Sequence, residues 1–331
     1  MTEDRMHEPA RVTIGVPVYN GGRLLEEMLE SLRRQSYRQF RVVICDNAST
    51  DDTPAIASRF VASDPRFSYH RNPTNIGAAP NFNRAFELDH ATPYFKWAAH
   101  DDLYEPTYLE SCIAALDADP DAVVAYPMTV LVDETREGLA LDTLCLDDAV
   151  VDSYTDDRNR PCWTIGPLHL AEGKDPVHRL EQLLEQMIGS FEIFGVMRTS
   201  ALERTELHAS YYGSDRPLLA QLVLMGPFRQ VPERLYINRY HVAASRRLSR
   251  QQLRTWIDTK GSSRWRVLHL YWDLLRAPFI ARLSTRDRLR CGFVILRNFG
   301  TRYAGRLNRK LARTRQGRAE ISTSPIKRGT S

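Results

Sequence analysis

Polar side chains that could do chemistry stand directly after the apolar runs of the N-terminal part of the chain. Asp46 follows the run FRVVIC, and His100, Asp101 and Asp102 follow YFKWAA. In open α/β sheets, ligands bind at the carboxyl ends of the strands. A carboxylate at position 46 can accept a hydrogen bond from a pyrimidine N–H. Adjacent carboxylates repel each other unless a cation joins them, so Asp101 and Asp102 predict a divalent ion on a diphosphate, with helix capping as the alternative.

Three further polar segments occupy similar positions. PVYNGG at 17–22 follows the first apolar run, and its alternative interpretation is a tight strand-to-helix turn. DNASTDD at 46–52 can hold a ring amide, a ribose hydroxyl or a helix terminus. NPTNIG at 72–77 precedes Asn81, Asn83 and Arg84, and its alternative is a turn followed by a polar helix face.

The elements that must position these residues follow an α/β pattern. Short β-branched runs alternate with longer segments at helical spacing, which is typical of a mainly parallel sheet. We expect strands at 11–18, 40–45, 67–70, 94–98 and 122–126. Helices are expected at 24–36, 53–62, 79–88 and 106–116, the last one beginning with a first-turn proline.

The second half of the chain is less regular. Residues 133–175 lose periodicity and predict a long irregular insertion of the kind that forms lids or binding loops. Beyond it we expect helices at 177–187, 200–207 and 216–224 and strands at 193–197 and 228–237. The predicted organisation is a polar tail (1–10), an α/β domain (11–130), a second half (131–245), a basic amphipathic helical region (246–315) and a disordered tail (316–331).

Composition and charge narrow the class of protein. The chain has 331 residues, of which 43% are hydrophobic, so it is not a disordered chain. Residues 246–331 hold 22 basic and 4 acidic side chains, whereas residues 1–245 hold 23 basic and 37 acidic ones. An acidic body is therefore joined to a strongly basic C-terminal region. The five cysteines form no CxxC pair, which argues against a disulfide framework and a zinc site.

The location of the protein is also a sequence-based expectation. The first ten residues, MTEDRMHEPA, lack the apolar run of a secretory signal, and no stretch reaches the roughly 20 apolar residues that span a bilayer. We expect a cytoplasmic protein that meets the inner face of a membrane only at its surface.

Four motifs together resemble those of a known family. VPVYN, CDNASTDDT, NPTNIGAAPNFNRA and KWAAHDD follow one another in an order and spacing that resemble glycosyltransferase family 2. The resemblance covers residues 11–245 and is closest up to residue 130. It implies a GT-A fold, a nucleotide-sugar donor, a divalent metal (Mg²⁺ or Mn²⁺) and inversion at the anomeric carbon.

The resemblance also implies roles for individual residues. The positions that match the donor site are Pro17, Tyr19, Asn20, Asp46 (the base-recognising acid), Asn75, Arg84 and Asp101. Asp101 and Asp102 match the metal and diphosphate site, although Ala99 stands where the family pattern Asp-x-Asp-Asp has its first acid. Arg239 and His241, in NRYH, resemble a late basic element that reaches the diphosphate or the metal.

Two positions in the second half match the acceptor side of the family. Asp215, in YYGSDR, has the context of the catalytic base that opens a helix, with a helix N-cap as its alternative. Gly195, in SFEIFGVMR, resembles a small residue that makes room for the acceptor.

The basic region allows three interpretations. Aromatic and aliphatic residues alternate with arginines within 250–315, as in interfacial helices on an anionic membrane. The helices can instead fold back on the acidic body, and arginines with aromatics also suit nucleic acid. We expect no nucleic-acid partner.

The expected function is transfer of a sugar from a nucleotide donor, UDP- or dTDP-linked in preference to GDP-linked, to a hydroxyl of a cell-envelope glycan or lipid-linked acceptor. Two alternatives remain. A sugar-nucleotide nucleotidyltransferase would need a Gly-rich, Lys-bearing loop where VPVYNGGR stands, and a non-catalytic nucleotide-sugar-binding protein is compatible with Ala99.

Overall fold

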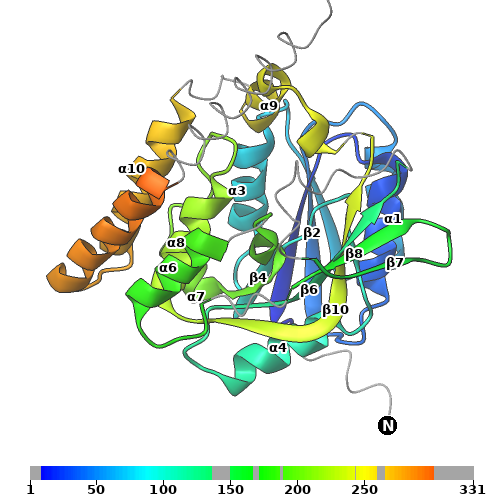
Figure 1. The fold of residues 1–331 in the computed structure, drawn as a ribbon. Helices are drawn as coiled ribbons and strands as arrows, with labels where there is room; N and C mark the ends of the chain where they lie inside the picture. Colours follow the sequence, from blue (N-terminus) through cyan, green and yellow to red (C-terminus); the bar gives the residue numbers. More distant parts are fainter. Residues whose placement is uncertain are drawn as a thin grey trace, which may run out of the picture.

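The computed structural model describes residues 9–135, 150–166, 171–186, 189–242, 244–258 and 265–301. They form a mixed β-sheet with helices on both faces and a further layer of helices beyond one face (Figure 1). Strands from both predicted halves, 11–130 and 131–245, join the same sheet.

The sheet has the order β3-β2-β1-β4-β9-β6-β10-β5. Its first part is parallel and consists of β3 (Phe67–Arg71), β2 (Phe40–Asp46), β1 (Val12–Val18) and β4 (Tyr94–Trp97). The second part is mixed: β9 (Val196–Arg198) is antiparallel to β4 and β6, β6 (Val124–Asp133) is parallel to β10 (Phe228–Tyr240), and β5 (Leu103–Tyr104) is antiparallel to β10. The loops that follow β1, β2 and β4 therefore leave the sheet at one edge.

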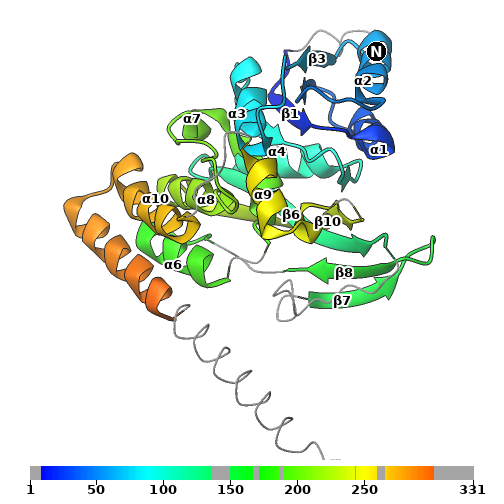
Figure 2. The same ribbon diagram turned by 90° about the horizontal axis from the view of Figure 1, so that it is seen from above.

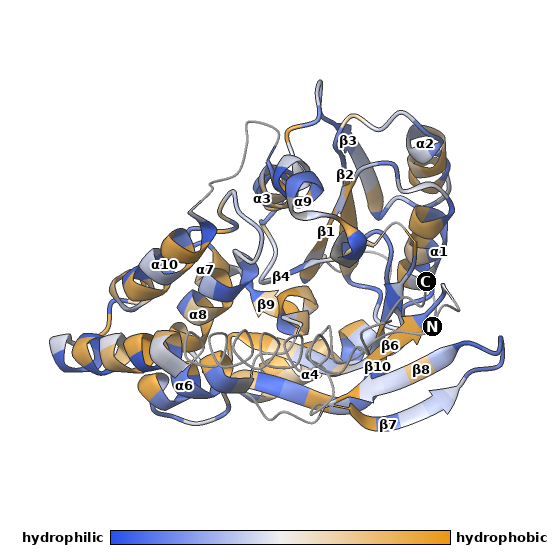
Figure 3. Ribbon diagram, turned by 45° about the horizontal axis from the view of Figure 1, so that its top comes forward, coloured by the Kyte–Doolittle hydropathy of each residue, from blue (hydrophilic) through white to orange (hydrophobic). Residues whose placement is uncertain are grey.

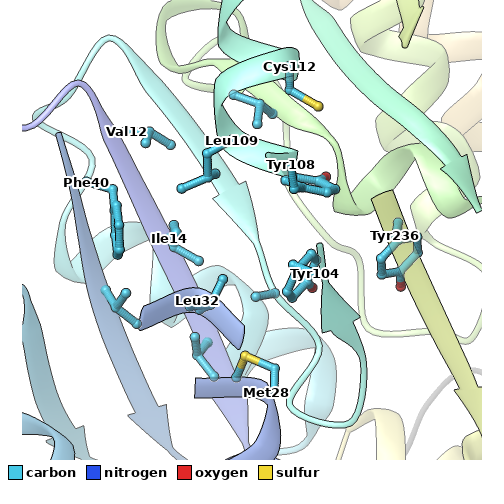
Figure 4. Packing of buried hydrophobic residues seen from close by; sticks show 14 of the residues in the cluster. Val12, Ile14, Met28, Leu32, Phe40, Tyr104, Tyr108, Leu109, Cys112 and Tyr236 are labelled. Atoms are coloured by element: carbon cyan, nitrogen blue, oxygen red, sulfur yellow. The ribbon is translucent and has the colours of Figure 1, made fainter. Parts of the chain in front are cut away.

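Three helices cover one face of the sheet: α1 (Gly22–Arg33), α2 (Thr53–Ser63) and α4 (Tyr108–Ala118). In Figure 4, Met28 and Leu32 of α1 and Leu109 of α4 lie against the β1 side chains Val12 and Ile14. These side chains are fully buried. The spacing of Leu25, Met28, Leu29 and Leu32 is what gives α1 its single apolar face.

The opposite face carries α3 (Ala78–Leu88) and α8 (Asp215–Met225). α8 is apolar on nearly all sides because α6 (Pro176–Gln186) and α10 (Arg266–Ile280) pack against it from outside the sheet layer. Residues 285–301 are helical, and their buried residues Cys291, Val294 and Ile295 belong to the same apolar cluster. Figure 2 shows this helix beside α6 and α10.

The predicted elements of the N-terminal part are confirmed to within one or two residues, with three exceptions. α1 ends three residues earlier than expected, β6 continues to Asp133 instead of ending at residue 126, and the sequence did not indicate the short β5. The fold class is also confirmed as α/β with a helical C-terminal region, although the complete sheet is mixed rather than mainly parallel. Antiparallel pairing enters where β9 is inserted between β4 and β6.

Three predictions for the second half are wrong. The expected irregular insertion contains a hairpin, β7 (Val150–Thr155) and β8 (Pro161–Ile165), that pairs with β6, while residues 136–149 and 167–170 of it lie outside the described residues. The expected strand at 193–197 begins as a 3-10 helix, η3 (Phe191–Phe194). The sequence could not distinguish the two, because apolar runs this short suit either structure. The expected helix at 200–207 is the single turn α7 (Thr199–Leu202).

The C-terminal part begins with η4 (Ser245–Arg247) and α9 (Arg250–Ile257), whose Ser249 and Gln252 form a capping box. α9 packs on α3, close to the strand ends (Figure 1). Residues 302–331, which include the predicted tail, lie outside the described residues. Within the described ranges, no helix combines the length and the apolar character that crossing a bilayer requires.

Candidate functional site

The loops after β1 and β2 are joined by short hydrogen bonds. The side-chain oxygen of Ser49 accepts from the Asn20 backbone N–H at 2.9 Å, and Asn20 Oδ1 accepts from the Thr50 backbone N–H at 2.8 Å. Asn20 has a φ of 53°, which asparagine tolerates better than most residues. Tyr19, 41% exposed, projects from this junction, and Pro17 lies in the last part of β1. The predicted donor residues Pro17, Tyr19 and Asn20 are therefore neighbours of the second-strand loop.

Asp46 ends β2 and is fully buried. Its Oδ1 accepts from the backbone N–H of Ser49 at 2.8 Å, and its Oδ2 accepts from the Tyr69 hydroxyl at 2.6 Å. Arg71 Nε lies 3.9 Å from Oδ2. Burial, followed by the hydrogen bond to Asp46, raises the pKa of Tyr69 well above its usual value. Recognition of a base by Asp46 stays a prediction, and it would use the lone pairs that these donors leave open.

An amide network holds the third loop. Asn47 Nδ2 donates to Asn75 Oδ1 at 2.9 Å and to the Gly77 carbonyl at 3.1 Å, while Asn47 Oδ1 accepts from the Ile76 backbone N–H. Asn81 fixes the other side, since its Nδ2 donates to the Cys45 carbonyl at 3.0 Å. Asn75 is thus placed beside the second-strand loop, and its contact with a donor stays a prediction. Sequence reasoning did not single out Asn47, whose position directly after Asp46 was the available signal.

Arg84 lies on the exposed side of α3, with its guanidinium 3.8 Å from Glu87. Half of its side chain is exposed. A donor-binding role for Arg84 stays a prediction, and its weak surface ion pair leaves the guanidinium available to an anion.

The acidic segment after β4 meets the end of β10. Asp101 Oδ2 lies 3.0 Å from His241 Nε2, across 140 positions of sequence. Burial raises the pKa of Asp101, but the nearby His100 and the hydrogen bond to His241 outweigh it and lower the pKa to about 2. Burial lowers the pKa of His100. Asp101 is therefore an ionised carboxylate that is hydrogen-bonded to the imidazole of His241. The structure thus brings together Asp101 and His241, two residues that were predicted to act together.

Asp102 is turned the other way, into the protein. It is 1% exposed, and its oxygens accept hydrogen bonds from the Tyr236 hydroxyl, from Asn238 Nδ2 at 3.0 Å and from the Arg239 backbone N–H at 3.0 Å. Burial and then the charge of Asp101 raise the pKa of Asp102 to about 7. Metal binding by Asp102 stays a prediction, and it would require one of these donors to be exchanged for the ion.

Arg239 lies beneath the site. Its side chain is 1% exposed and donates to the Asp101 carbonyl, to Glu27 Oε2 and to the Leu24 carbonyl at 3.2 Å. These contacts join β10, α1 and the acidic segment. The structure thus gives Arg239 a role in positioning Asp101, and its guanidinium is occupied within the protein.

Lys96 is a buried ionisable residue within electrostatic range of Asp102 that the sequence analysis did not single out. It is fully buried in β4, and its Nζ lies 3.9 Å from the centre of the Tyr104 ring and 4.8 Å from that of Tyr108. Nζ also donates to the Trp97 carbonyl at 3.0 Å. Burial lowers the pKa of Lys96 to about 7. The signal was a lysine inside an otherwise apolar strand, YFKWA, three residues before Ala99.

The fit of a divalent cation can be judged from these side chains. Within the described ranges, no cluster of three or more His, Cys, Asp or Glu side chains has the arrangement of a metal site. Asp101 and His241 together offer one oxygen and one nitrogen, which suit Mn²⁺ better than Mg²⁺. The pair fits a cation that takes its remaining ligands from a diphosphate and water.

Asp215 is the first residue of α8, as its predicted role requires. In the part of the chain that the structure describes, its carboxylate makes no hydrogen bond or ion pair, and Ser214 rather than Asp215 occupies the N-cap position. Two buried groups lie within electrostatic range of it. Burial and the Asp215 charge raise the pKa of Glu192 to about 7, whereas burial lowers the pKa of His208 to about 4.

Glu192 and His208 each present a buried polar atom without a partner. These atoms are Glu192 Oε2 and His208 Nε2. η3, which carries Glu192, packs against both β4 and α8, while the His208 ring lies 5.0 Å from that of Trp97. Sequence reasoning did not find either residue. Together with Asp215 they gather unpaired polar groups at the start of α8.

The loop before α8 is fixed to α3. Asn83 Nδ2 donates to the His208 carbonyl at 2.9 Å, and Asn83 Oδ1 accepts from the His208 backbone N–H at 2.9 Å. Gly195 lies after η3, where an added Cβ would be 2.7 Å from the Ala125 carbonyl. Its small size therefore allows close packing on β6, and its contact with an acceptor stays a prediction.

Sequence comparisons relate the N-terminal part of the chain to a known family. Residues 13–163 match the family model described as Glycosyl transferase family 2. The putative glycosyltransferase EpsE of Bacillus subtilis is 36% identical over 114 residues, which cover 34% of this chain and 40% of that protein. The GalNAc(5)-diNAcBac-PP-undecaprenol beta-1,3-glucosyltransferase of Campylobacter jejuni is 22% identical over 213 residues, which cover 64% of this chain and 59% of that protein. The chain spans less than two thirds of the length of these relatives.

Solved structures share the fold. The S. aureus TarS fragment 1–349 in complex with UDP-GlcNAc superimposes with a TM-score of 0.56 at 13% identity, covering 87% of this chain and 72% of that one. The same fragment in another crystal structure gives a TM-score of 0.54 at 14% identity. This likeness confirms the GT-A fold that the sequence resemblance implied.

Proposed function

Because residues 13–163 belong to glycosyl transferase family 2, we propose that this protein is an inverting glycosyltransferase that moves a sugar from a nucleoside-diphosphate donor to a hydroxyl acceptor. The observation that carries the proposal is the pair formed by Asp101 and His241 at the carboxyl end of β4, beside the loops after β1 and β2. Ligands of parallel α/β sheets bind at this edge.

The donor would lie across these loops. Tyr19 offers an exposed ring, and Asp46 with Asn75 would bound the base and the ribose. A carboxylate that accepts a pyrimidine N–H favours UDP- or dTDP-sugars. TarS, which shares the fold, was crystallised with UDP-GlcNAc, and this supports a nucleotide-sugar donor without fixing its base.

The cation in this proposal is Mg²⁺ or Mn²⁺, held by Asp101 and His241, with Asp102 behind them. When bound, it would neutralise the charge that develops on the departing diphosphate. Arg239 fixes the Asp101 backbone from below, and the Tyr236 hydroxyl and Asn238 hold Asp102. These contacts hold the site in place without involving the carboxylate oxygens of Asp101.

Asp215 is the proposed general base. It would take the proton of the acceptor hydroxyl as that oxygen attacks the anomeric carbon, while the diphosphate leaves from the opposite face. A base must be free to accept a proton, and in the described residues the Asp215 carboxylate has no competing partner. Glu192 and His208 are suited to contact acceptor hydroxyls, since each has an unpaired polar atom. Gly195 lies on the same segment as Glu192 and would border the acceptor.

The proposed acceptor is a cell-envelope glycan or a lipid-linked saccharide. The relative from Campylobacter jejuni is named for an undecaprenol-linked acceptor, and its match extends over 64% of this chain. We also propose that the protein works at an anionic membrane surface, on the cytoplasmic side, and meets it through part of residues 250–315.

Product analysis tests the proposal against its alternatives. The purified protein is incubated with UDP-, dTDP- and GDP-sugars and a mixture of lipid-linked and soluble saccharide acceptors. A glycosyltransferase releases the nucleoside diphosphate. A nucleotidyltransferase releases pyrophosphate when it is given a nucleoside triphosphate and a sugar 1-phosphate, and a binding protein releases neither product. Asp215→Asn should lower transfer about 10² to 10⁴-fold while donor binding is retained. Asp121→Asn, at an exposed position, is the matched control. Wild-type transfer by Asp215→Asn would remove Asp215 from the mechanism.

A further inference from the structure

α10 and the helix formed by residues 285–301 make up the outermost layer of the protein (Figure 2). They pack on each other through Tyr271 and Phe299, whose ring centres lie 4.7 Å apart. The second helix is also attached to α6, because Asn298 Nδ2 donates to the Leu184 carbonyl at 3.1 Å. The two helices are therefore a folded part of the body and not a detached extension.

Each helix exposes a row of large apolar side chains. On α10 the row is Leu268, Trp272 and Phe279, which are 61%, 62% and 60% exposed. On the second helix it is Leu289, Phe293 and Leu296, which are 73%, 68% and 61% exposed. We call these six residues the outer apolar face.

The members of each row recur at spacings of three, four and seven residues and so share one side of their helix. That side is opposite to the buried residues Leu274, Ala277, Cys291 and Ile295. The colours of Figure 3 show apolar residues on both sides of α10. In the second row, Leu289 and Phe293 also border a hollow beside Val177 and His178 of α6. Exposed apolar rows on two helices are uncommon on a monomer and mark an interaction site.

Five of the seven arginines in this layer fall into two groups, while Arg266 and Arg288 lie over the rings of Tyr212 and Phe279. Arg276, Arg290 and Arg297 form ion pairs with Glu206, Asp175 and Glu181 of the acidic body. The predicted folding back of basic helices on the body therefore applies to these three. Arg282, in the turn between the helices, and Arg286, in the first turn of the second helix, are exposed and form no ion pair within the described residues.

We propose that the outer apolar face, with Arg282 and Arg286, docks on the surface of an anionic lipid bilayer. This inference rests on the proposed function in one respect, namely that the acceptor is linked to a membrane. Trp and Phe suit the boundary between headgroups and acyl chains, and unpaired arginines suit anionic headgroups. The sequence that follows the second helix, residues 302–331, contains nine basic and one acidic side chain.

Charge also sets the direction of docking. Residues 1–245 carry a net charge of −14 and are repelled by an anionic leaflet, whereas the C-terminal region is attracted to it. A second copy of the chain would bring two such basic faces together and would have to overcome their repulsion. The bilayer is therefore the occupant that charge complementarity favours.

Vesicle co-sedimentation of the full-length protein tests the proposal. Wild-type protein should bind vesicles of phosphatidylcholine with phosphatidylglycerol, bind pure phosphatidylcholine more weakly, and lose affinity as salt is raised. Trp272→Ser with Phe293→Ser should weaken binding about tenfold, since two partly immersed aromatic rings are lost. Arg282→Gln with Arg286→Gln should weaken it about fivefold per arginine. The matched control is Val61→Ser with Val151→Ser, two exposed valines elsewhere on the surface.

Each outcome bears on the proposal. Unchanged binding by the Trp272/Phe293 variant would overturn it, because the basic chain beyond residue 301 would then suffice. Absence of wild-type binding, or a dimer in sedimentation equilibrium that only the Trp272/Phe293 variant loses, would also overturn it. Circular dichroism checks that the variants are folded. Vesicle binding without nucleoside-diphosphate release would leave docking intact and remove the proposed activity, so the two failures are distinguishable.

Discussion

The buried Lys96 gives the structure a measurable pH dependence. Burial lowers its pKa from 10.5 to about 7, so folding costs free energy whenever the ammonium would be charged in the unfolded chain. The cost is present in full below pH 7 and is relieved as the pH rises from about 7 to 10.5. Each pH unit within this window corresponds to about 1.4 kcal/mol at most, so the free energy of unfolding should gain about 2 kcal/mol from Lys96 between pH 7 and pH 9.

Lys96→Met isolates this contribution. Methionine has a similar length and no charge, so it can fill the space beside Tyr104 and Tyr108. Urea unfolding at pH 7 and pH 9 should show a rise for the wild-type protein that is about 2 kcal/mol larger than the rise for Lys96→Met. Lys174→Met, at an exposed position, should keep the wild-type pH dependence. Equal pH dependence in wild type and Lys96→Met would refute the reasoning, because the lysine would then be charged in its buried site.

Three other predictions concern the groups that support the site. Arg239→Met should lower the free energy of unfolding by about 3 kcal/mol in urea titrations, because it removes a buried guanidinium together with its ion pair to Glu27 Oε2 and its hydrogen bonds to two carbonyls. Arg234→Met, at an exposed ion pair, should cost less than about 1 kcal/mol. Similar losses in both variants would contradict this. Gly77→Ala should lower the melting temperature and expose α9 to protease, since Gly77 has a φ of 92° and an added Cβ would lie 2.6 Å from Asp258 Cα; Gly292→Ala, with open space around it, should not. Because burial raises the pKa of Glu192 from 4.5 to about 7, the wild-type protein should lose stability as the pH rises from 4.5 to 7. Glu192→Gln should reduce this loss, and an unchanged dependence of stability on pH would argue that Glu192 is hydrated.

Local patterns were sufficient to predict the N-terminal part of the fold. The runs around Ile14, Ile44 and Phe95 are short, β-branched or aromatic and bounded by polar loops, so they identify strands without tertiary information. The strand β9 and the 3-10 helix η3 were not separable in this way. The apolar segment FEIFGVM fits either structure. The close packing of Gly195 on the Ala125 carbonyl is a tertiary contact that the sequence does not reveal.

The candidate site was predictable where it follows strand ends. Asp46 and Asp101 were found because parallel strands bring their carboxyl ends together. The different contacts of Asp101 and Asp102 were not predictable, because their partners are distant in sequence. Asp101 is hydrogen-bonded to His241, whereas Asp102 accepts from the Tyr236 hydroxyl. Glu192 and His208 belong to no sequence motif. They become candidates for the site only because the fold places both of them within electrostatic range of Asp215.

The central claim is a metal-assisted nucleoside-diphosphate site, and ligand-induced thermal stabilisation tests it most directly. The melting temperature is measured with UDP, dTDP, GDP and CMP, each with Mn²⁺, Mg²⁺ or EDTA, for wild type, Asp101→Asn and His241→Gln. A ligand that binds only the folded state stabilises it by mass action. The account predicts a rise with UDP or dTDP that needs the cation and is lost in both variants. No rise with any nucleotide would contradict the account and favour a protein that does not bind nucleotide sugars.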